Sequence, residues 1–124
     1  MIIIDSSGWI EYFTDGPLKK RYDKHIADAS VIVVPTIVIY EVYRKIRRDS
    51  SEKSAVRAAR SLTDHTVVPL TETIALTAAE LGLEHSLHLA DSIIYATAFE
   101  HGCRLVTSDA HFEGLGNVVY IRKA

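Results

Sequence analysis

The sequence feature that most constrains the fold is a helix, a turn and a strand that follow one another between residues 88 and 109. Apolar residues at 89, 90, 93, 94, 96 and 98 give this segment a wide apolar face, which is typical of a helix packed against a sheet. Gly102 predicts the end of the helix, because glycine readily adopts the left-handed conformation found there. The apolar run Cys103–Thr107 then predicts a buried strand, and Ser108 and Asp109 follow it.

The rest of the chain repeats this alternation. Apolar runs predict further strands at residues 2–4, 31–34, 66–70 and 118–121, and the intervening segments predict helices at about 9–13, 18–29, 37–48, 52–64 and 71–83. Alternating strands and helices indicate a parallel sheet with right-handed crossovers. We therefore expect a single α/β domain over residues 1–124. Its predicted architecture is a doubly wound three-layer sandwich with a mostly parallel five-stranded sheet in the order 3-2-1-4-5.

Composition sets broad limits on the class of protein. With 48% hydrophobic and 24% charged residues, the chain has the profile of a soluble globular domain. The single cysteine, Cys103, excludes an intrachain disulfide and a cysteine zinc cluster, and it favours a reducing cytoplasm. We expect no signal peptide, because no basic leader precedes Ile2. The longest apolar run, Val31–Tyr40, is too short to span a bilayer, so no membrane partner is expected.

Four carboxylates are predicted to meet at the carboxyl edge of the sheet. Asp5 ends the first strand, Glu41 lies early in the helix after the second, Asp91 opens the helix of residues 89–98, and Asp109 ends the fourth strand. In the expected order the first and fourth strands are neighbours, so their ends flank the crevice where such sheets bind ligands. Each acid also has a local explanation, as a helix N-cap, a helix-dipole partner or an ion-pair partner on a helix surface.

Crowding of the four acids has a chemical consequence. Carboxylates within a few ångströms repel one another and therefore require protons or a cation. Ligation by carboxylate oxygens and water suits Mg²⁺ or Mn²⁺ rather than zinc. Such a site can position water and neutralise phosphate oxygens during an in-line displacement.

The motifs around these acids resemble those of PIN-domain endoribonucleases, and most of all the small VapC-type toxins of prokaryotic toxin–antitoxin pairs. In chain order they are Asp5-Ser6-Ser7, Glu41, Leu89-Ala90-Asp91 with Ile94, and Leu105-Val106-Thr107-Ser108-Asp109. The resemblance covers essentially the whole chain and implies an Mg²⁺- or Mn²⁺-dependent ribonuclease. It implies that the catalytic and metal-binding residues are Asp5, Glu41, Asp91 and Asp109, with Ser6 and Thr107 in support. It also implies an RNA substrate, an antitoxin partner, a homodimer and a cytoplasmic location.

The sequence departs from the family pattern at two positions. Tyr95 stands where a small residue is usual, which predicts a change in the groove wall. Ser108 stands where a larger polar or basic residue is common, which predicts altered substrate contacts.

Two surface features have more than one interpretation. A basic cluster lies one to two helical turns beyond Glu41 and could hold RNA phosphates; it contains Arg44, Lys45, Arg47 and Arg48. The alternative is a solvated basic face. An aromatic stripe of Trp9, Tyr12 and Phe13 could belong to the core or could line a groove that receives a partner's helix.

Other functional classes fit the sequence less well. A PIN-domain nuclease that processes RNA without being a toxin would have the same site. A non-catalytic module with an acidic pocket would need a lysine after its last strands, but Lys123 is terminal. A histidine-based hydrolase could use His85, His88 and Asp91, which are spaced by three residues. The predicted helix start near His88 breaks that common face, and no third histidine has a clear role.

Overall fold

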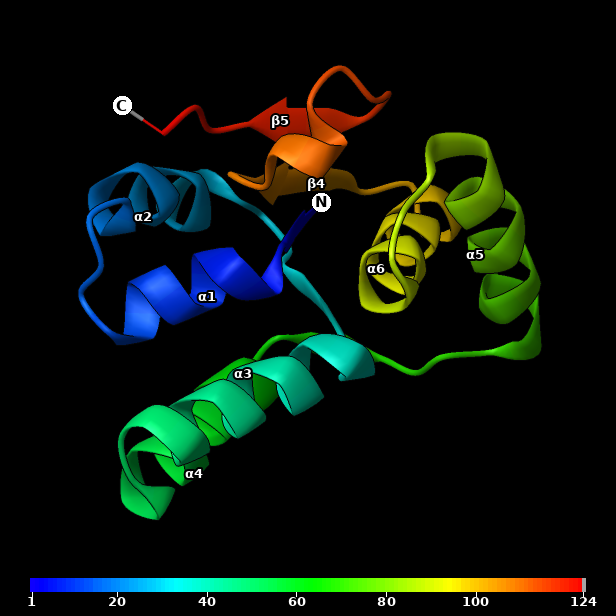
Figure 1. Ribbon diagram of the computed structural model, residues 1–124. Helices are drawn as coiled ribbons and strands as arrows, with labels where there is room; N and C mark the ends of the chain where they lie inside the picture. The colour runs from blue at the N-terminus through cyan, green and yellow to red at the C-terminus, as the bar shows by residue number, and fades with distance from the viewer. Residues whose placement is uncertain (124) are drawn as a thin grey trace.

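The computed structural model describes residues 1–123 and shows an α/β fold in which helices surround short parallel strands (Figure 1). The strands are β1 (Ile2–Ile4), β2 (Val33–Pro35), β3 (Thr66–Val68), β4 (Arg104–Thr107) and β5 (Val118–Tyr120). The helices are α1 (Ser6–Phe13), α2 (Lys19–Asp28), α3 (Thr36–Asp49), α4 (Glu52–Thr63), α5 (Glu72–His85) and α6 (Leu89–Glu100), and a 3₁₀ turn, η1 (Ala110–Phe112), follows β4. The predicted alternation of strands and helices is confirmed.

The strands form two parallel sheets rather than one continuous sheet. One contains β1, β4 and β5 in the order β1-β4-β5, and the other contains β2 and β3. A single bridge between Ile2 and Ile32 joins β1 to the segment before β2. Within residues 1–123, no further bridge joins β1 to β2. The fold is therefore mostly parallel α/β, as expected, but its strands do not form a five-stranded hydrogen-bonded sheet.

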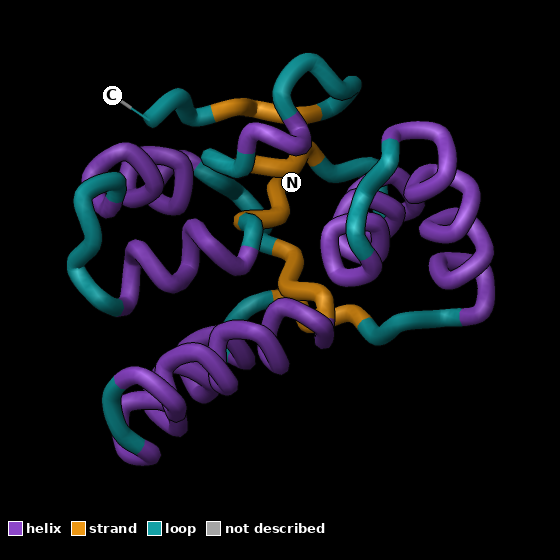
Figure 2. The backbone as a smooth tube through the Cα atoms, viewed as in Figure 1, coloured by secondary structure: helices purple, strands orange, loops and turns teal. Residues whose placement is uncertain are grey.

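Neighbouring helices in the chain pack as pairs around the strands. Figures 1 and 2 show α3 beside α4 and α5 beside α6, on two different sides of the strands. Helix α1 contacts both α2 and α3, and α3 also contacts α6. Among residues 1–123, no helix is long and apolar enough to cross a membrane.

Local signals account for most helix boundaries. Asp5 is the N-cap of α1, where its side chain accepts a hydrogen bond from the backbone N–H of Ser6. Gly102 has a φ of 65° just after α6, which confirms the predicted left-handed residue. Helix α3 differs from expectation by one residue, because Pro35 occupies the N-cap position and Thr36 is already helical. Proline fits there because its fixed φ suits the residue that leads into the first turn.

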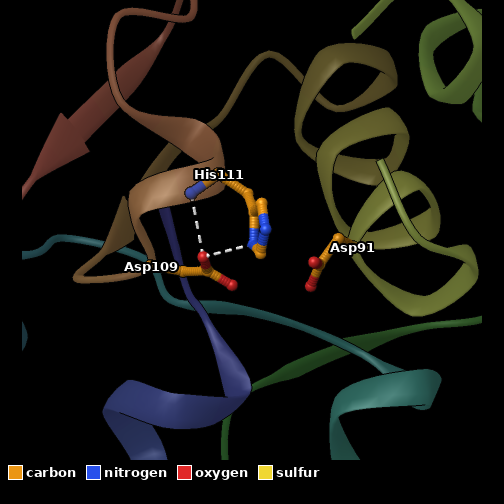
Figure 3. A group of neighbouring side chains, drawn as sticks. All are labelled: Asp91, Asp109 and His111. Carbon is orange, nitrogen blue, oxygen red and sulfur yellow. Dashed lines mark hydrogen bonds and ion pairs between the residues drawn. The ribbon is translucent and has the colours of Figure 1, made fainter. Parts of the chain in front are cut away.

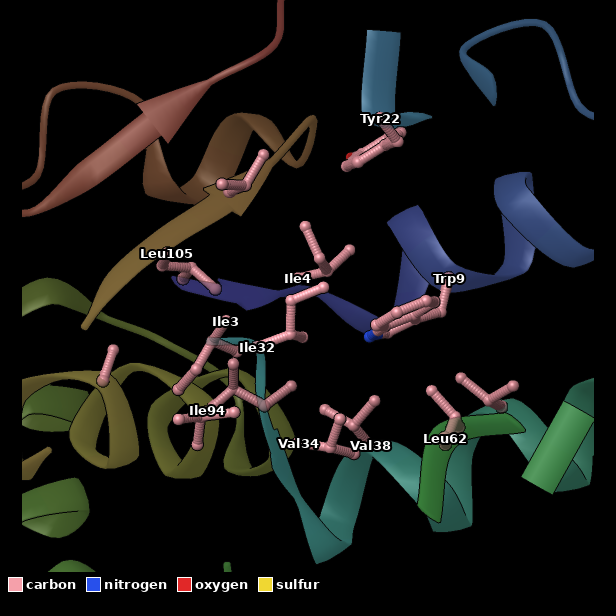
Figure 4. Packing of buried hydrophobic residues seen from close by; sticks show 14 of the residues in the cluster. Ile3, Ile4, Trp9, Tyr22, Ile32, Val34, Val38, Leu62, Ile94 and Leu105 are labelled. Atoms are coloured by element: carbon pink, nitrogen blue, oxygen red, sulfur yellow. The ribbon is translucent and has the colours of Figure 1, made fainter. Parts of the chain in front are cut away.

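The core lies on both faces of β1. Successive side chains of a strand point to opposite faces, and Figure 4 shows Ile4 near Trp9 and Tyr22, and Ile3 near Ile94. All five of these side chains are buried. Strand β1 is therefore buried on both faces, although it forms the edge of the three-stranded sheet.

The aromatic stripe is divided between the core and the surface. Trp9 is 2% exposed and belongs to the core, so the interpretation of all three rings as a partner contact is wrong for this residue. Its ring stacks on that of Phe13, with centroids 5.7 Å apart. Tyr12 and Phe13 are only partly buried. Tyr12 and Phe13 lie on the same helix face as Trp9 and pack against the core, but they are not enclosed by it.

Candidate active site

One cavity of about 350 Å³ is lined by all four predicted acids. Asp5 and Asp109 follow β1 and β4, which pair directly, so parallel alignment brings both to one edge. Glu41 comes from α3 and Asp91 from the first turn of α6. Ser6, Ser7, Ile10, Tyr40, Arg44, Lys45 and Arg48 complete the lining.

Asp5 is the most buried of the four acids and is 4% exposed. One carboxylate oxygen accepts a hydrogen bond from the Ser6 backbone N–H at 2.7 Å. The other accepts from Thr107 Oγ1 at 2.7 Å and from Ser7 Oγ at 3.2 Å. Burial raises the pKa of Asp5, these hydrogen bonds lower it, and the negative charge of Asp91 raises it; the net result is a pKa of about 6. The carboxylate is therefore fixed in place and poorly solvated.

Two hydroxyl groups connect the acids. Thr107 Oγ1 donates to Asp5 and accepts a hydrogen bond from the backbone N–H of Asp109 at 3.0 Å. Ser6 Oγ donates to Glu41 Oε1 at 2.5 Å. The two residues predicted to support the acids therefore lie between them, one at the β1–β4 side and one at the α3 side.

Asp91 lies in the first turn of α6, where its charge complements the helix dipole, but it also lies close to other acids. Burial raises its pKa, and repulsion from Asp109 and Glu41 raises it further, while His111 and His88 act in the opposite direction. Asp109 is the N-cap of η1 and accepts a hydrogen bond from the backbone N–H of His111 at 2.9 Å. At the carboxyl edge of the strands, Asp109 therefore both caps η1 and lies close enough to Asp91 to repel its charge.

Sequence reasoning missed His111, which stands beside two of the acids. Its Nδ1 lies 2.9 Å from an oxygen of Asp109, and Figure 3 shows its ring beside the carboxylates of Asp109 and Asp91. Asp91, Asp109 and His111 each offer one ligand atom, and these three atoms lie within 4.8 Å of one another. The available signal was the spacing Asp109-x-His111 in the turn after a strand. His85, a residue of the histidine-based alternative, instead packs against the ring of Tyr95.

The residues of this cavity fit a divalent cation. Several carboxylates share a small, partly desolvated volume, and burial together with repulsion between the acids raises the pKa values of Asp5 and Asp91. A cation would compensate these charges. Oxygen donors of this kind are the ligands preferred by Mg²⁺ and Mn²⁺.

The predicted basic cluster is not a uniform group. Arg44, Lys45 and Arg48 line the acidic cavity, but Arg47 does not. Arg47 lines a different hollow on α3, to which Tyr40, Tyr43, Arg44 and Arg48 also contribute. Lys45 and Arg48 each form an ion pair with Asp49 at 2.9 Å. Within residues 1–123, neither Arg44 nor Arg47 has an ion-pair partner.

The two departures from the family pattern have structural roles. The Tyr95 hydroxyl donates to the backbone carbonyl of Gly116 at 2.8 Å, and the residue does not line the acidic cavity. Ser108 is buried and accepts a hydrogen bond from the Tyr22 hydroxyl at 2.9 Å. The expected changes in groove wall and substrate contact at these positions are therefore not seen in the cavity lining.

A larger cleft of about 750 Å³ lies next to the acidic cavity. Phe13 of α1, Ile46 of α3 and Ala58 of α4 line it. Ile10 and Lys45 line both the cleft and the acidic cavity. A molecule bound in the cleft would therefore lie beside the acids.

Fold and site together define an α/β domain that carries a carboxylate cluster at the carboxyl ends of parallel strands. The PIN domain family profile matches residues 2–117, and the chain belongs to this family. A search of curated proteins found no match.

Solved structures of toxins and of toxin–antitoxin complexes share this fold. A toxin–antitoxin complex from Klebsiella pneumoniae matches with a TM-score of 0.82 and 25% identity over 96% of each chain. VapC20 of Mycobacterium tuberculosis, described as a toxin that cleaves the sarcin–ricin loop, matches with a TM-score of 0.80 and 20% identity over 99% of this chain and 100% of its own. DNA-bound VapBC of Salmonella typhimurium matches with a TM-score of 0.77 and 15% identity over 98% of each chain.

Proposed function

We propose that the protein is a metal-dependent endoribonuclease that hydrolyses RNA phosphodiester bonds, and that it is the toxin of a type II toxin–antitoxin pair. The observation that carries this proposal is the convergence of Asp5, Glu41, Asp91 and Asp109 on one cavity of a PIN domain. The likeness to VapC20 and to toxin–antitoxin complexes supports the toxin assignment and an RNA substrate.

In the proposed mechanism the four acids hold the cation, and two neighbouring hydroxyl groups hold the acids in place. Asp5, Glu41, Asp91 and Asp109 would hold Mg²⁺ or Mn²⁺, which when bound supplies positive charge for phosphate oxygens and acidifies water. Thr107 holds Asp5 and the backbone of Asp109 in fixed relation. Ser6 orients Glu41 through its hydroxyl. Fixed carboxylates of this kind avoid reorganisation during the reaction.

The basic residues divide into two groups in the proposed complex with RNA. Arg44 lines the acidic cavity and lacks an ion-pair partner within residues 1–123, so it is placed to bind a phosphate close to the acids. Arg47 would bind the strand farther out along α3. Lys45 and Arg48 would first have to exchange Asp49 for RNA, which weakens their contribution.

We also propose an antitoxin partner that occupies the cleft between α1, α3 and α4. Phe13 and Ile46 give this cleft an apolar wall suited to a helix.

The proposal further includes a homodimer, a cytoplasmic location and the strand order 3-2-1-4-5 in a three-layer sandwich. Exposed leucines at positions 76 and 83 of α5 and 89 of α6 support a subunit interface. The Ile2–Ile32 bridge supports the strand order.

The proposal is tested by incubating purified protein with structured RNAs in Mg²⁺, Mn²⁺ or EDTA, beside Asp5→Asn. We expect cleavage with either cation, none in EDTA and none with the variant. Circular dichroism of the variant controls for folding. Cleavage that is unaffected by EDTA, or equal cleavage by folded Asp5→Asn, would contradict the proposal.

A further inference from the structure

One imidazole, that of His111, stands close to Asp91 and Asp109 although it does not itself line the acidic cavity. His111 belongs to η1, two residues beyond Asp109, while Asp91 reaches the same place from α6 (Figure 3). Their three candidate ligand atoms lie within 4.8 Å of one another. Bonds from a cation to its ligands are about 2.0–2.2 Å long, so ligands on opposite sides of one ion are separated by roughly 4.0–4.4 Å. A small contraction would bring all three onto one ion.

The position of the His111 ring is not explained by packing or helix capping. Its side chain is 61% exposed, so burial of the ring contributes little to the core. Its backbone N–H, not its ring, caps the turn by donating to Asp109. The ring nonetheless lies against the same carboxylate, at 2.9 Å. The ring of His88 meets that of His111 edge-to-face, with centroids 5.7 Å apart.

We propose that His111 is a metal ligand, which makes this a mixed carboxylate–imidazole site that prefers transition-metal dications such as Mn²⁺ and Co²⁺ over Mg²⁺. The proposal rests on the proposed function, because it concerns the same cation site. Imidazole nitrogen binds first-row transition metals well, whereas Mg²⁺ favours oxygen donors and retains its water. The nitrogen donor therefore determines which class of cation binds most tightly.

The test measures cation binding directly rather than catalysis. Protein freed of metal by EDTA and dialysis is titrated with MgCl₂ and, separately, with CoCl₂ in a calorimeter, and Co²⁺ binding is also followed by visible absorption. The variants are His111→Gln and the matched control His88→Gln, which changes the neighbouring imidazole that lies outside the three-residue group. Thermal melts in EDTA verify that each variant is folded.

We expect Co²⁺ to bind the unaltered protein more tightly than Mg²⁺. His111→Gln should weaken Co²⁺ binding at least about tenfold, since even residues that only orient a ligand have effects of that size. Mg²⁺ binding should change much less, and His88→Gln should leave the preference intact. A new Co²⁺ absorption band should weaken or shift only in His111→Gln.

Two results would overturn the role of His111 while leaving the cation site in place. Equal losses of Co²⁺ and Mg²⁺ binding in His111→Gln would mean that the ring only positions Asp109. An equal loss of preference in His88→Gln would mean that ring packing determines it. If the unaltered protein binds neither cation, the metal-dependent function itself fails together with this inference.

Discussion

Individual residues of the site are held in conditions that disfavour their charge. Asp5 is buried beside Asp91, and Asp91 faces Asp109 and Glu41. Hydrogen bonds from Thr107, Ser7 and the Ser6 backbone offset only part of this cost at Asp5. The metal-free fold should therefore be less stable when these carboxyl groups are ionised, and it should gain stability when a cation binds.

The raised pKa of Asp5 should make the free energy of unfolding depend on pH. Its pKa is about 6 in the folded protein, above its ordinary value of 3.8. The folded state therefore holds a proton that the unfolded chain releases, so this group favours folding below about pH 4. That contribution is lost as the pH rises through about 6. The pKa difference corresponds to about 3 kcal/mol.

Urea unfolding in EDTA between pH 4 and 7.5 measures this effect. The free energy of unfolding should fall with pH more steeply in the unaltered protein than in Asp5→Asn, because the variant has no carboxyl group to titrate. Identical pH profiles for the two proteins would show that Asp5 carries no such charge penalty.

Asp91→Asn should have opposite effects on the metal-free and metal-bound proteins. Without metal it removes repulsion with Asp109 and Glu41, so stability should be unchanged or higher by about 1 kcal/mol. With excess Mn²⁺ the variant should gain less stability than the unaltered protein. Thermal melts in EDTA and in Mn²⁺ measure both effects. If Asp91 served only the helix dipole, the variant would lose about 0.3–1 kcal/mol in both conditions.

At the scale of elements, the junction of β1 and α1 depends on close packing against α2. A Cβ added at Gly8 would lie 2.4 Å from Tyr22 Cε1 and 2.7 Å from Ile4 Cγ2. Both neighbours are fully buried, and the Tyr22 hydroxyl also bonds to Ser108 after β4. This contact therefore connects α1, α2 and the end of β4 directly beside the acids.

Gly8→Ala should destabilise the protein by about 1–3 kcal/mol through overpacking. Helix propensity alone would predict the opposite change, because it favours alanine over glycine by about 1 kcal/mol. Gly82→Ala is the matched control, because its Cβ would lie 3.2 Å from the nearest atom, Ser92 Cβ, and should clash less. Chemical unfolding of both variants decides the matter, and a Gly8→Ala protein as stable as the parent would disprove the packing argument.

Elements with strong local signals were predictable from sequence. Helix α6, the left-handed residue Gly102 and the run that forms β4 are encoded within a few residues of one another. The predicted single apolar face of α6 is wrong in detail, because Leu89 is 78% exposed and residues 92–98 are all buried. The separation of β2 from β1 was not predictable, because it depends on how helices far apart in sequence pack around the strands. The burial of Trp9 likewise depends on tertiary contacts.

The convergence of the four acids on one cavity was predictable because strand ends in a parallel sheet meet at one edge. Asp5 and Asp109 follow strands that pair, as the doubly wound strand order predicts. His111 escaped prediction because the short turn η1 directs its ring back toward Asp109. Arg44 and Arg47 line one hollow on α3, as their proximity in sequence suggests, but only Arg44 also lines the acidic cavity.

At the scale of the whole molecule, the acidic cavity and the apolar cleft are adjacent. Ile10 and Lys45 belong to the walls of both. A partner that fills the cleft would therefore also restrict access to the acids. This arrangement connects the proposed catalytic site to the proposed control by an antitoxin.

The most direct test of the account is the rate of RNA cleavage in Mn²⁺ by Glu41→Gln, Asp91→Asn and Asp109→Asn, beside Glu84→Gln. Glu84 is an exposed acid on α5 that does not line the cavity, so it controls for the loss of a negative charge. If the acids act as one site, each of the three variants should cleave at least about 100-fold more slowly, while Glu84→Gln should retain the full rate. Cleavage at the unaltered rate by folded Glu41→Gln or Asp109→Asn would contradict the four-carboxylate site.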